Sequence, residues 1–175
     1  MNRFWGHLST INHHKILVTK LCFRCHLYKQ GILHDLSKYS PVEFWAGVTY
    51  YQGFRSPINR EVKGYSLGWL HHKGRNRHHW EYWLDNGNVK NGVIAIEMPV
   101  NYVVEMICDR IAASMTYQKE NYTDASALEY FLNGYDRVMM HPNTKALTQH
   151  ILEYLRDHGL DQTIAYIRHN ILKNK

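Results

Sequence analysis

The sequence is poor in cysteine and has no long apolar run. Its 175 residues include only three cysteines, Cys22, Cys25 and Cys108, which are too few for a disulfide framework and favour a reducing compartment. No segment approaches the roughly 18 consecutive apolar residues of a membrane-spanning helix. No basic patch leads into an apolar stretch at the N-terminus, so we expect no secretory signal. These features predict a soluble, cytoplasmic protein with no membrane partner.

The composition is that of an ordinary globular protein, with 45% hydrophobic and 21% charged residues. The length predicts a single domain over residues 1–175. A formal net charge of +6 favours anionic partners, either small phosphorylated molecules such as nucleotides or nucleic acid. Thirteen histidines are an enrichment, and histidine is the commonest metal ligand. Histidines that lie close to acidic residues are therefore candidate metal ligands.

Apolar spacing predicts an all-α fold of about six to eight helices. The expected helices cover residues of about 4–29, 41–52, 61–72, 99–118, 124–140, 143–158 and 161–172. Gly31 is expected to end the first helix, and Ser40 with Glu43 is expected to form a capping box for the second. Turn signals around a short apolar run predict a small β-hairpin within residues 84–97. The helices of 124–173 carry little chemistry, so we expect them to cover the core or to form an oligomer contact.

A histidine and an aspartate stand side by side at His34-Asp35, directly after an apolar pair. His14 lies on the apolar face of the preceding predicted helix, and Asp109 lies among apolar residues of a later one. A buried carboxylate needs a partner. Imidazole nitrogens and carboxylate oxygens drawn from several helices form divalent-metal sites. The sequence therefore predicts such a site, although a lone His14 could also be an ordinary core histidine.

Two further histidine pairs, His71-His72 and His78-His79, follow the His-Asp pair. Asn76 is expected to cap a helix that begins at the next residue. In a continuous helix His72 and His79, seven residues apart, would share a face. We therefore expect His72 of the first pair and His79 of the second pair to be metal ligands.

Three cations, Lys73, Arg75 and Arg77, lie between and beside these histidines. Cations at a predicted helix start suit an anionic ligand. We expect them to bind the substrate; a solvated basic turn is the alternative.

The segment Cys22-Phe23-Arg24-Cys25-His26 has the form of the c-type haem attachment motif. Haem attachment of that kind requires an exported protein, which we do not expect here. Cys25 also belongs to the apolar stripe of the first predicted helix. We therefore expect the two cysteines to pack in the core.

His14, His34-Asp35 and Asp109, in that order, resemble the HD-domain superfamily of metal-dependent phosphohydrolases. That superfamily is all-helical and binds a divalent metal through a histidine, an adjacent His-Asp pair and a later aspartate. The resemblance covers roughly residues 7–115. It implies an HD-type bundle, one divalent metal (Mn, Mg, Zn or Fe) held by those four residues, and Lys38 as the lysine that typically follows the pair.

Many members of the superfamily bind a second metal through histidines between the pair and the last aspartate, where the two downstream histidine pairs lie. The strings His34–Lys38, Asn76–Trp83 and Glu105–Arg110 are more closely similar to a bacterial and phage family of unassigned function.

The resemblance implies hydrolysis of a phosphate ester on a nucleotide or similar small anion by a metal-activated water. Lys38 would offset charge on the phosphoryl oxygens, and Glu105 or Glu81 would orient the attacking water. An HD-type di-iron oxygenase is one alternative, because some members use histidine-rich iron pairs with oxygen. A non-enzymatic, metal-stabilised module for nucleic acid or a protein partner is another, since five tryptophans and thirteen tyrosines could stack on bases.

Overall fold

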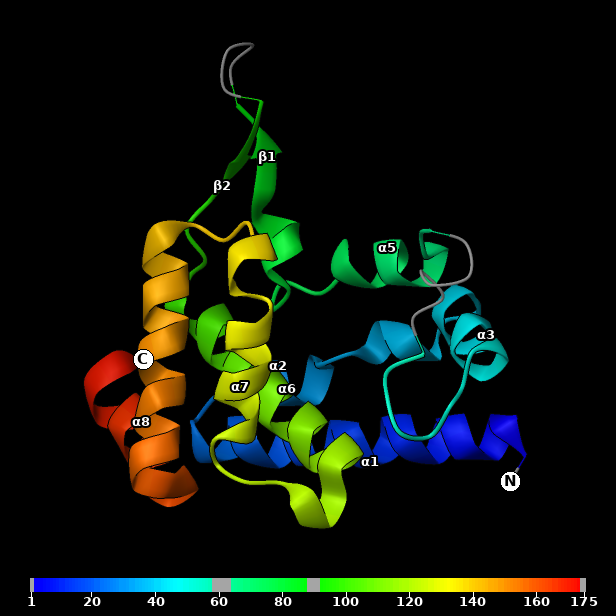
Figure 1. Ribbon diagram of the computed structural model, residues 1–175, viewed down its shortest axis with the longest axis horizontal. Coiled ribbons are helices and arrows are strands. Elements are labelled where there is room, and N and C mark those ends of the chain that lie inside the picture. Colours follow the sequence, from blue (N-terminus) through cyan, green and yellow to red (C-terminus); the bar gives the residue numbers. More distant parts are fainter. Residues whose placement is uncertain (1, 58–63, 88–91, 174–175) are drawn as a thin grey trace.

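The computed structural model describes residues 2–57, 64–87 and 92–173 (Figure 1). Within these ranges the chain forms seven α-helices and one antiparallel hairpin, which confirms the predicted all-α class and the hairpin. The helices are α1 (Arg3–Arg24), α2 (Tyr28–Leu33), α3 (Pro41–Thr49), α5 (Leu67–Lys73), α6 (Val100–Gln118), α7 (Ser126–Asn133) and α8 (Pro142–Tyr166). Shorter 3₁₀ or π turns cover Leu36–Tyr39, Trp80–Trp83, Lys119–Asn121, Tyr135–Arg137 and Ile167–Ile171. No helix in the described ranges is both long and apolar enough to cross a membrane.

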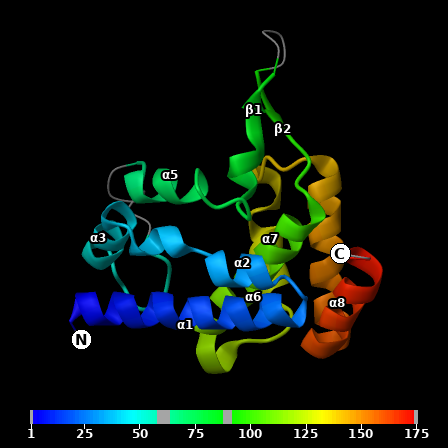
Figure 2. The ribbon, with the colours of Figure 1, turned by 180° about the vertical axis from the view of Figure 1, so that it is seen from behind.

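The core lies around α6, which packs against α1 on one side and against α7 and α8 on the other (Figures 1 and 2). Each helix presents apolar residues three or four positions apart, which places them in one stripe. Val18 and Leu21 of α1, Ile107 of α6, and Leu152 and Leu155 of α8 are buried in this core. Each leucine buried in this way stabilises the fold by roughly 1.5–3 kcal/mol.

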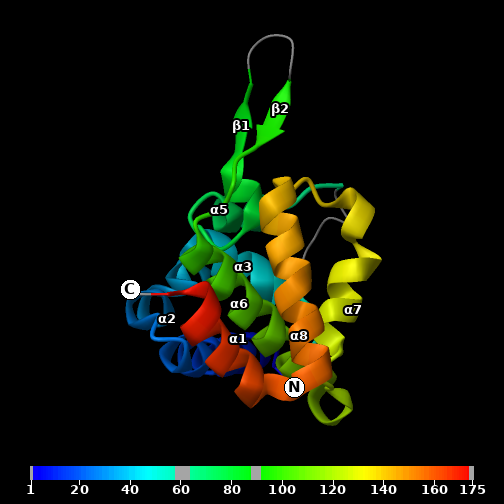
Figure 3. The same ribbon diagram turned by 90° about the vertical axis from the view of Figure 1, so that its left-hand side faces the viewer.

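The elements that carry the polar motifs gather beside this core. Helix α3 packs against α5 and against the N-terminal half of α1 (Figure 2). The hairpin of β1 (Leu84–Asn86) and β2 (Val93–Ala95), in which Leu84 pairs with Ala95, projects from the helical body (Figure 3). The His34-Asp35 pair lies between α1, α5 and α6, because its side chains lie close to His14, His72 and Asp109 of those helices.

The first helix is shorter than predicted, and Gly31 does not end it. Helix α1 stops at Arg24, and His26 adopts a left-handed backbone with φ of 62°. Gly31 lies inside α2 and is buried against α1, where a Cβ would meet Phe23 Cδ1 at 3.0 Å and Cys22 Cβ at 3.1 Å. This glycine therefore permits close packing of two helices, a tertiary requirement that local sequence patterns do not show. Cys22 is buried in the core, as expected.

The capping box predicted at Ser40 is wrong. Ser40 precedes α3, but its side chain makes no capping hydrogen bond. The Glu43 carboxylate accepts hydrogen bonds from His71 and His72 of α5 instead. Helix α3 also ends at Thr49, before the predicted end at about residue 52.

The helix predicted to begin at Arg77 is also wrong. Helix α5 ends at Lys73, and residues 74–79 form a turn before the short 3₁₀ segment Trp80–Trp83. Asn76 caps no helix, because its Nδ2 donates to Ser37 Oγ and to the His72 carbonyl. The helix predicted over 61–72 begins at Leu67 in the described part, and residues 61–63 lie outside it.

The C-terminal helices occur in the predicted order but with different bounds, and the segment predicted as a helix over 161–172 is the end of α8 followed by the π turn Ile167–Ile171. The predicted 124–140 helix is α7 (Ser126–Asn133), and it gives way to a 3₁₀ turn after Gly134. Pro142 opens α8, and Gly159 interrupts that helix with φ of 78°, near the predicted break.

Candidate metal centre

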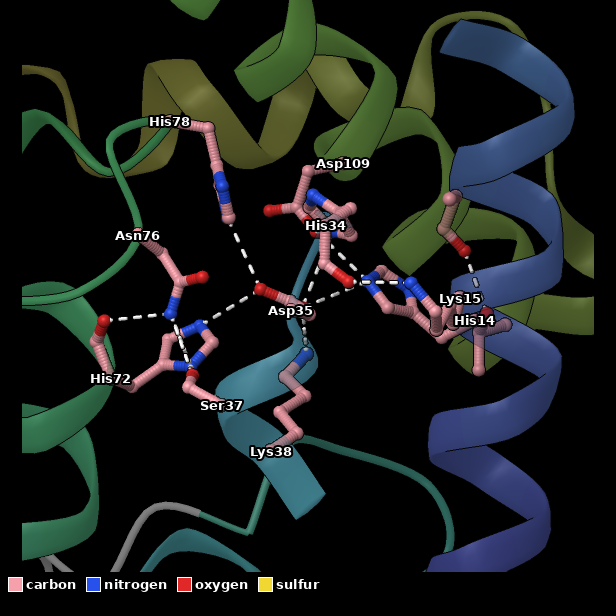
Figure 4. Close-up of polar contacts among 12 residues, drawn as sticks. His14, Lys15, His34, Asp35, Ser37, Lys38, His72, Asn76, His78 and Asp109 are labelled. Atoms are coloured by element: carbon pink, nitrogen blue, oxygen red, sulfur yellow. Dashed lines mark hydrogen bonds and ion pairs between the residues drawn. The ribbon is translucent and has the colours of Figure 1, made fainter. Parts of the chain in front are cut away.

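Asp35 lies at the middle of the polar cluster (Figure 4). It precedes the 3₁₀ turn Leu36–Tyr39 and adopts a left-handed backbone with φ of 55°. A non-glycine residue in that conformation costs roughly 1–2 kcal/mol and persists only where its surroundings hold it there. Only 2% of the side chain is exposed. The unusual backbone therefore directs a buried carboxylate between α1, α5 and α6.

The structure brings together the four residues predicted for the first metal. His14 Nε2 lies 2.9 Å from Asp109 Oδ1 and 3.8 Å from Asp35 Oδ2. His34 Nε2 lies 3.2 Å from Asp35 Oδ2 and 3.4 Å from Asp109 Oδ1. All four ligand atoms lie within 4.8 Å of one another, so they could hold one metal ion.

A second group meets the other oxygen of Asp35. His72 Nε2 and His78 Nε2 each lie 3.4 Å from Asp35 Oδ1. His79 completes the group, whose ligand atoms again lie within 4.8 Å of one another. Asp35 therefore presents Oδ2 to the first group and Oδ1 to the second, an arrangement suited to a carboxylate that bridges two metal ions.

The members of the two histidine pairs differ in their contacts. His72 belongs to the second group, whereas His71 Nδ1 donates to Glu43 Oε1 at 2.6 Å. Both His78 and His79 belong to the group, because they lie in a turn rather than on one face of a helix. The predicted ligand His79 therefore belongs to the group together with His78, although the two do not lie on a continuous helix with His72.

Two buried carboxylates contact the outer nitrogens of these histidines. Glu105 Oε1 accepts from His34 Nδ1 at 3.0 Å and lies 3.2 Å from His78 Nδ1. Glu43 Oε2 accepts from His72 Nδ1 at 2.7 Å. Carboxylates in such positions orient metal-binding imidazoles and raise their basicity. The sequence around Glu43 predicts a helix cap, whereas the contact with His72 arises from the packing of α3 on α5.

Burial and opposite charges compete in this cluster. Burial alone would raise the pKa of Asp35, but His34 and Lys38 hold it well below its ordinary value. Burial would lower the pKa of His34, but Asp35, Asp109 and Glu105 raise it well above its ordinary value. Burial and Lys38 lower the pKa of His14. The cluster thus concentrates negative charge that requires a cation or bound protons to balance it.

The donor atoms fit a divalent metal. His34 Nε2, His78 Nε2 and Asp35 Oδ1 are buried and have no hydrogen-bond partner in the described part of the chain. Buried polar atoms are normally paired, and these three converge on the same region. Imidazole with carboxylate oxygen suits zinc, iron and manganese. A third set of close donors, His34, His78 and Glu105, is better explained by the hydrogen bonds to Glu105.

The remaining predicted site residues differ in their placement. Lys38 Nζ lies 2.6 Å from Asp35 Oδ2. Glu81 lies in the 3₁₀ segment Trp80–Trp83, and within the described ranges no polar contact joins it to a metal ligand. Its role in orienting water stays a prediction.

The three predicted substrate-binding cations lie towards the surface. Arg77 is exposed, and its guanidinium donates to the Tyr102 hydroxyl at 3.3 Å. Arg75 is also exposed and donates to the His71 carbonyl at 3.5 Å. Among the described residues, no side-chain contact joins Lys73, Arg75 or Arg77 to either metal group. Their part in substrate binding stays a prediction.

The fold and the cluster define an all-α protein with buried histidine and carboxylate groups that could hold metal ions. The profile of one protein family, described as "Family of unknown function (DUF5662)", matches residues 3–154. The chain belongs to this family, which agrees with the expected similarity to a family of unassigned function. No curated protein matches the chain, and no solved structure matches it.

Proposed function

We propose that the protein is a metal-dependent phosphohydrolase of the HD type, acting on a nucleotide or another small phosphorylated substrate. The observation that carries the proposal is the position of Asp35, whose two oxygens face separate groups of side chains that could each hold a metal ion. Pairs of metal ions that share a carboxylate suit phosphate esters, because they can stabilise both the attacking and the leaving oxygen.

The residues divide into two ligand sets around that carboxylate. His14, His34 and Asp109 would hold one divalent cation, and His72, His78 and His79 would hold the other. Cations bound there would supply a water of lowered pKa and positive charge beside the phosphoryl group.

Lys38 contributes a further positive charge at the same place. Its side chain is 29% exposed, although its ammonium contacts the buried Asp35. Burial opposes the charged form, but Asp35 and Asp109 raise the pKa of Lys38 above its ordinary value, so the side chain remains an ammonium. Because the side chain joins the cluster to solvent, it is suited to neutralise charge that develops on a phosphoryl oxygen.

The nitrogen-rich donor set supports a second candidate. Five histidines accompany two aspartates in the two groups, and imidazole ligands also suit iron. An HD-type di-iron oxygenase therefore remains the alternative enzyme.

The proposal is tested by measuring bound metal and phosphate release in the same protein samples. Wild type, Asp35→Ala and the control His13→Ala, which alters an exposed neighbour of His14, are loaded with Mn²⁺, Zn²⁺ or Fe²⁺. Released phosphate is then measured with p-nitrophenyl phosphate and nucleoside monophosphates. We expect metal and turnover in wild type and His13→Ala, and neither in Asp35→Ala.

Three other outcomes would contradict the phosphohydrolase. Oxygen consumption by the iron-loaded protein without phosphate release would favour the oxygenase. Metal binding with no turnover, together with salt-dependent oligonucleotide binding, would favour a binding module. Absence of bound metal in wild type would exclude both enzymes.

A further inference from the structure

Glu105 contacts a histidine from each metal group. It lies on α6, one helical turn before Asp109, and is 5% exposed. A single atom, Glu105 Oε1, lies 3.0 Å from His34 Nδ1 and 3.2 Å from His78 Nδ1. His34 belongs to the first group and His78 to the second. Apart from Asp35 itself, no other carboxylate in the described part of the chain makes contacts with both groups.

The contacts of Glu105 determine which nitrogen of each neutral imidazole carries the hydrogen atom and which carries the lone pair. A neutral imidazole carries hydrogen on one nitrogen and a lone pair on the other. When Nδ1 donates to Glu105, the lone pair is on Nε2. His34 Nε2 lies 3.2 Å from Asp35 Oδ2, and His78 Nε2 lies 3.4 Å from Asp35 Oδ1. Once both imidazoles are neutral, as metal binding requires, both lone pairs therefore face Asp35.

We propose that Glu105 is a positioning residue that fixes the tautomer of His34 and His78 and thereby links the two metal sites through one oxygen atom. The proposal rests on the metal centre proposed above and is independent of the reaction that the centre catalyses. It differs from the role of orienting water expected from the sequence, because Glu105 contacts the nitrogens opposite to those that face Asp35.

Glu43 provides a matched comparison. It is also a buried glutamate, and its Oε2 accepts from His72 Nδ1 at 2.7 Å. Its other oxygen accepts from His71 Nδ1, and His71 belongs to neither metal group. Glu43 therefore supports the second site alone, whereas Glu105 supports both.

The experiment is a Co²⁺ titration of chelator-treated protein, followed by calorimetry and by visible absorption, which reports the ligands of the ion. Wild type is compared with Glu105→Leu, Glu105→Gln and Glu43→Leu. Loss of an orienting carboxylate typically weakens metal binding by about 10- to 100-fold. We expect Co²⁺ binding to weaken by this factor at both sites in Glu105→Leu and at one site in Glu43→Leu. Glu105→Gln keeps an acceptor oxygen in place, so it should bind Co²⁺ more tightly than the leucine variant.

Several results would overturn the proposal. One is unchanged affinity and absorption at both sites in Glu105→Leu, and another is weakening of only one site. Wild-type Co²⁺ binding by Glu105→Leu combined with loss of turnover would return Glu105 to the role of orienting water. Failure of wild type to bind Co²⁺ would overturn the metal centre and the linkage together.

Circular dichroism would show whether Glu105→Leu folds, and a second variant tests the proposal if it does not. Glu105→Asp keeps the charge but withdraws the carboxylate by one methylene. We expect it to weaken both sites, and wild-type binding by this variant would also overturn the linkage.

Discussion

Lys38 Nζ lies 2.6 Å from Asp35 Oδ2, the oxygen that also faces His14 Nε2 and His34 Nε2. A cation in the first metal group and the Lys38 ammonium would therefore share one carboxylate oxygen. Lys38 is three residues from Asp35 within the same turn, so it can remain close to the centre and still reach a substrate. Its removal should thus affect metal binding and turnover in different directions.

We predict that Lys38→Met binds the first metal at least as tightly as wild type but loses turnover. The competing ammonium is gone, whereas the charge that would stabilise the transition state is also gone. Removal of one such electrostatic contact typically reduces kcat by about 10²- to 10³-fold. Metal titration and steady-state kinetics of the same sample would measure both effects.

The control for this prediction is Lys20→Met, which removes an exposed lysine of α1. It should leave metal affinity and kcat unchanged. If Lys38→Met retained wild-type kcat, Lys38 would have no electrostatic role in the reaction.

We predict that the two ligand sets can be emptied separately. Asp109→Ala removes a ligand of the first group only, and His72→Ala removes one of the second group only. Each variant should retain one metal per chain, and Asp35→Ala should retain none, because Asp35 contributes to both groups. Elemental analysis of dialysed samples would give the stoichiometry. Complete metal loss in Asp109→Ala and His72→Ala alike would indicate one inseparable site.

The first metal group was predictable from the sequence because each of its members leaves a local signal. His14 falls on the face of α1 that apolar spacing marks as inward, Asp109 has apolar neighbours on α6, and His34-Asp35 is a contiguous pair. Helical periodicity alone predicts that such residues face the protein interior, even when the predicted end of a helix is wrong by several residues.

The second group and the outer carboxylates depend on tertiary packing. Glu43 follows a serine and a proline, a pattern typical of a capping box, yet its carboxylate lies against α5. His78 and His79 lie in a turn whose shape depends on contacts such as Asn76 Nδ2 to Ser37 Oγ. These contacts join residues 28 to 39 positions apart, so local sequence patterns do not show them.

We predict that metal binding stabilises the fold. A ligand that binds only the folded state adds RT ln(1 + [L]/Kd) to the free energy of unfolding, about 2.7 kcal/mol at a hundredfold excess over Kd. Chelation should therefore lower Tm in wild type, and Zn²⁺ should restore it. Asp35→Ala should show no response to chelator or metal, and an equal shift in both proteins would assign the effect to other sites.

We predict that His7 contributes to acid unfolding. Burial, aided by Lys38, lowers the pKa of His7 to about 4, from an ordinary value of 6.5. The unfolded chain therefore binds more protons than the folded chain between these values, so the free energy of unfolding falls as pH decreases through that window. The stabilisation is fully present above pH 6.5.

The measurement is urea unfolding of wild type and His7→Gln at pH 7.5 and pH 4.5, with chelator present so that metal ligands respond alike in both proteins. The glutamine does not titrate, and the His7 ring packs against Gly47 and Phe44, so the variant should be less stable at neutral pH. It should lose less stability than wild type on acidification. Equal losses in the two proteins would show that His7 is not protonated on unfolding in this range.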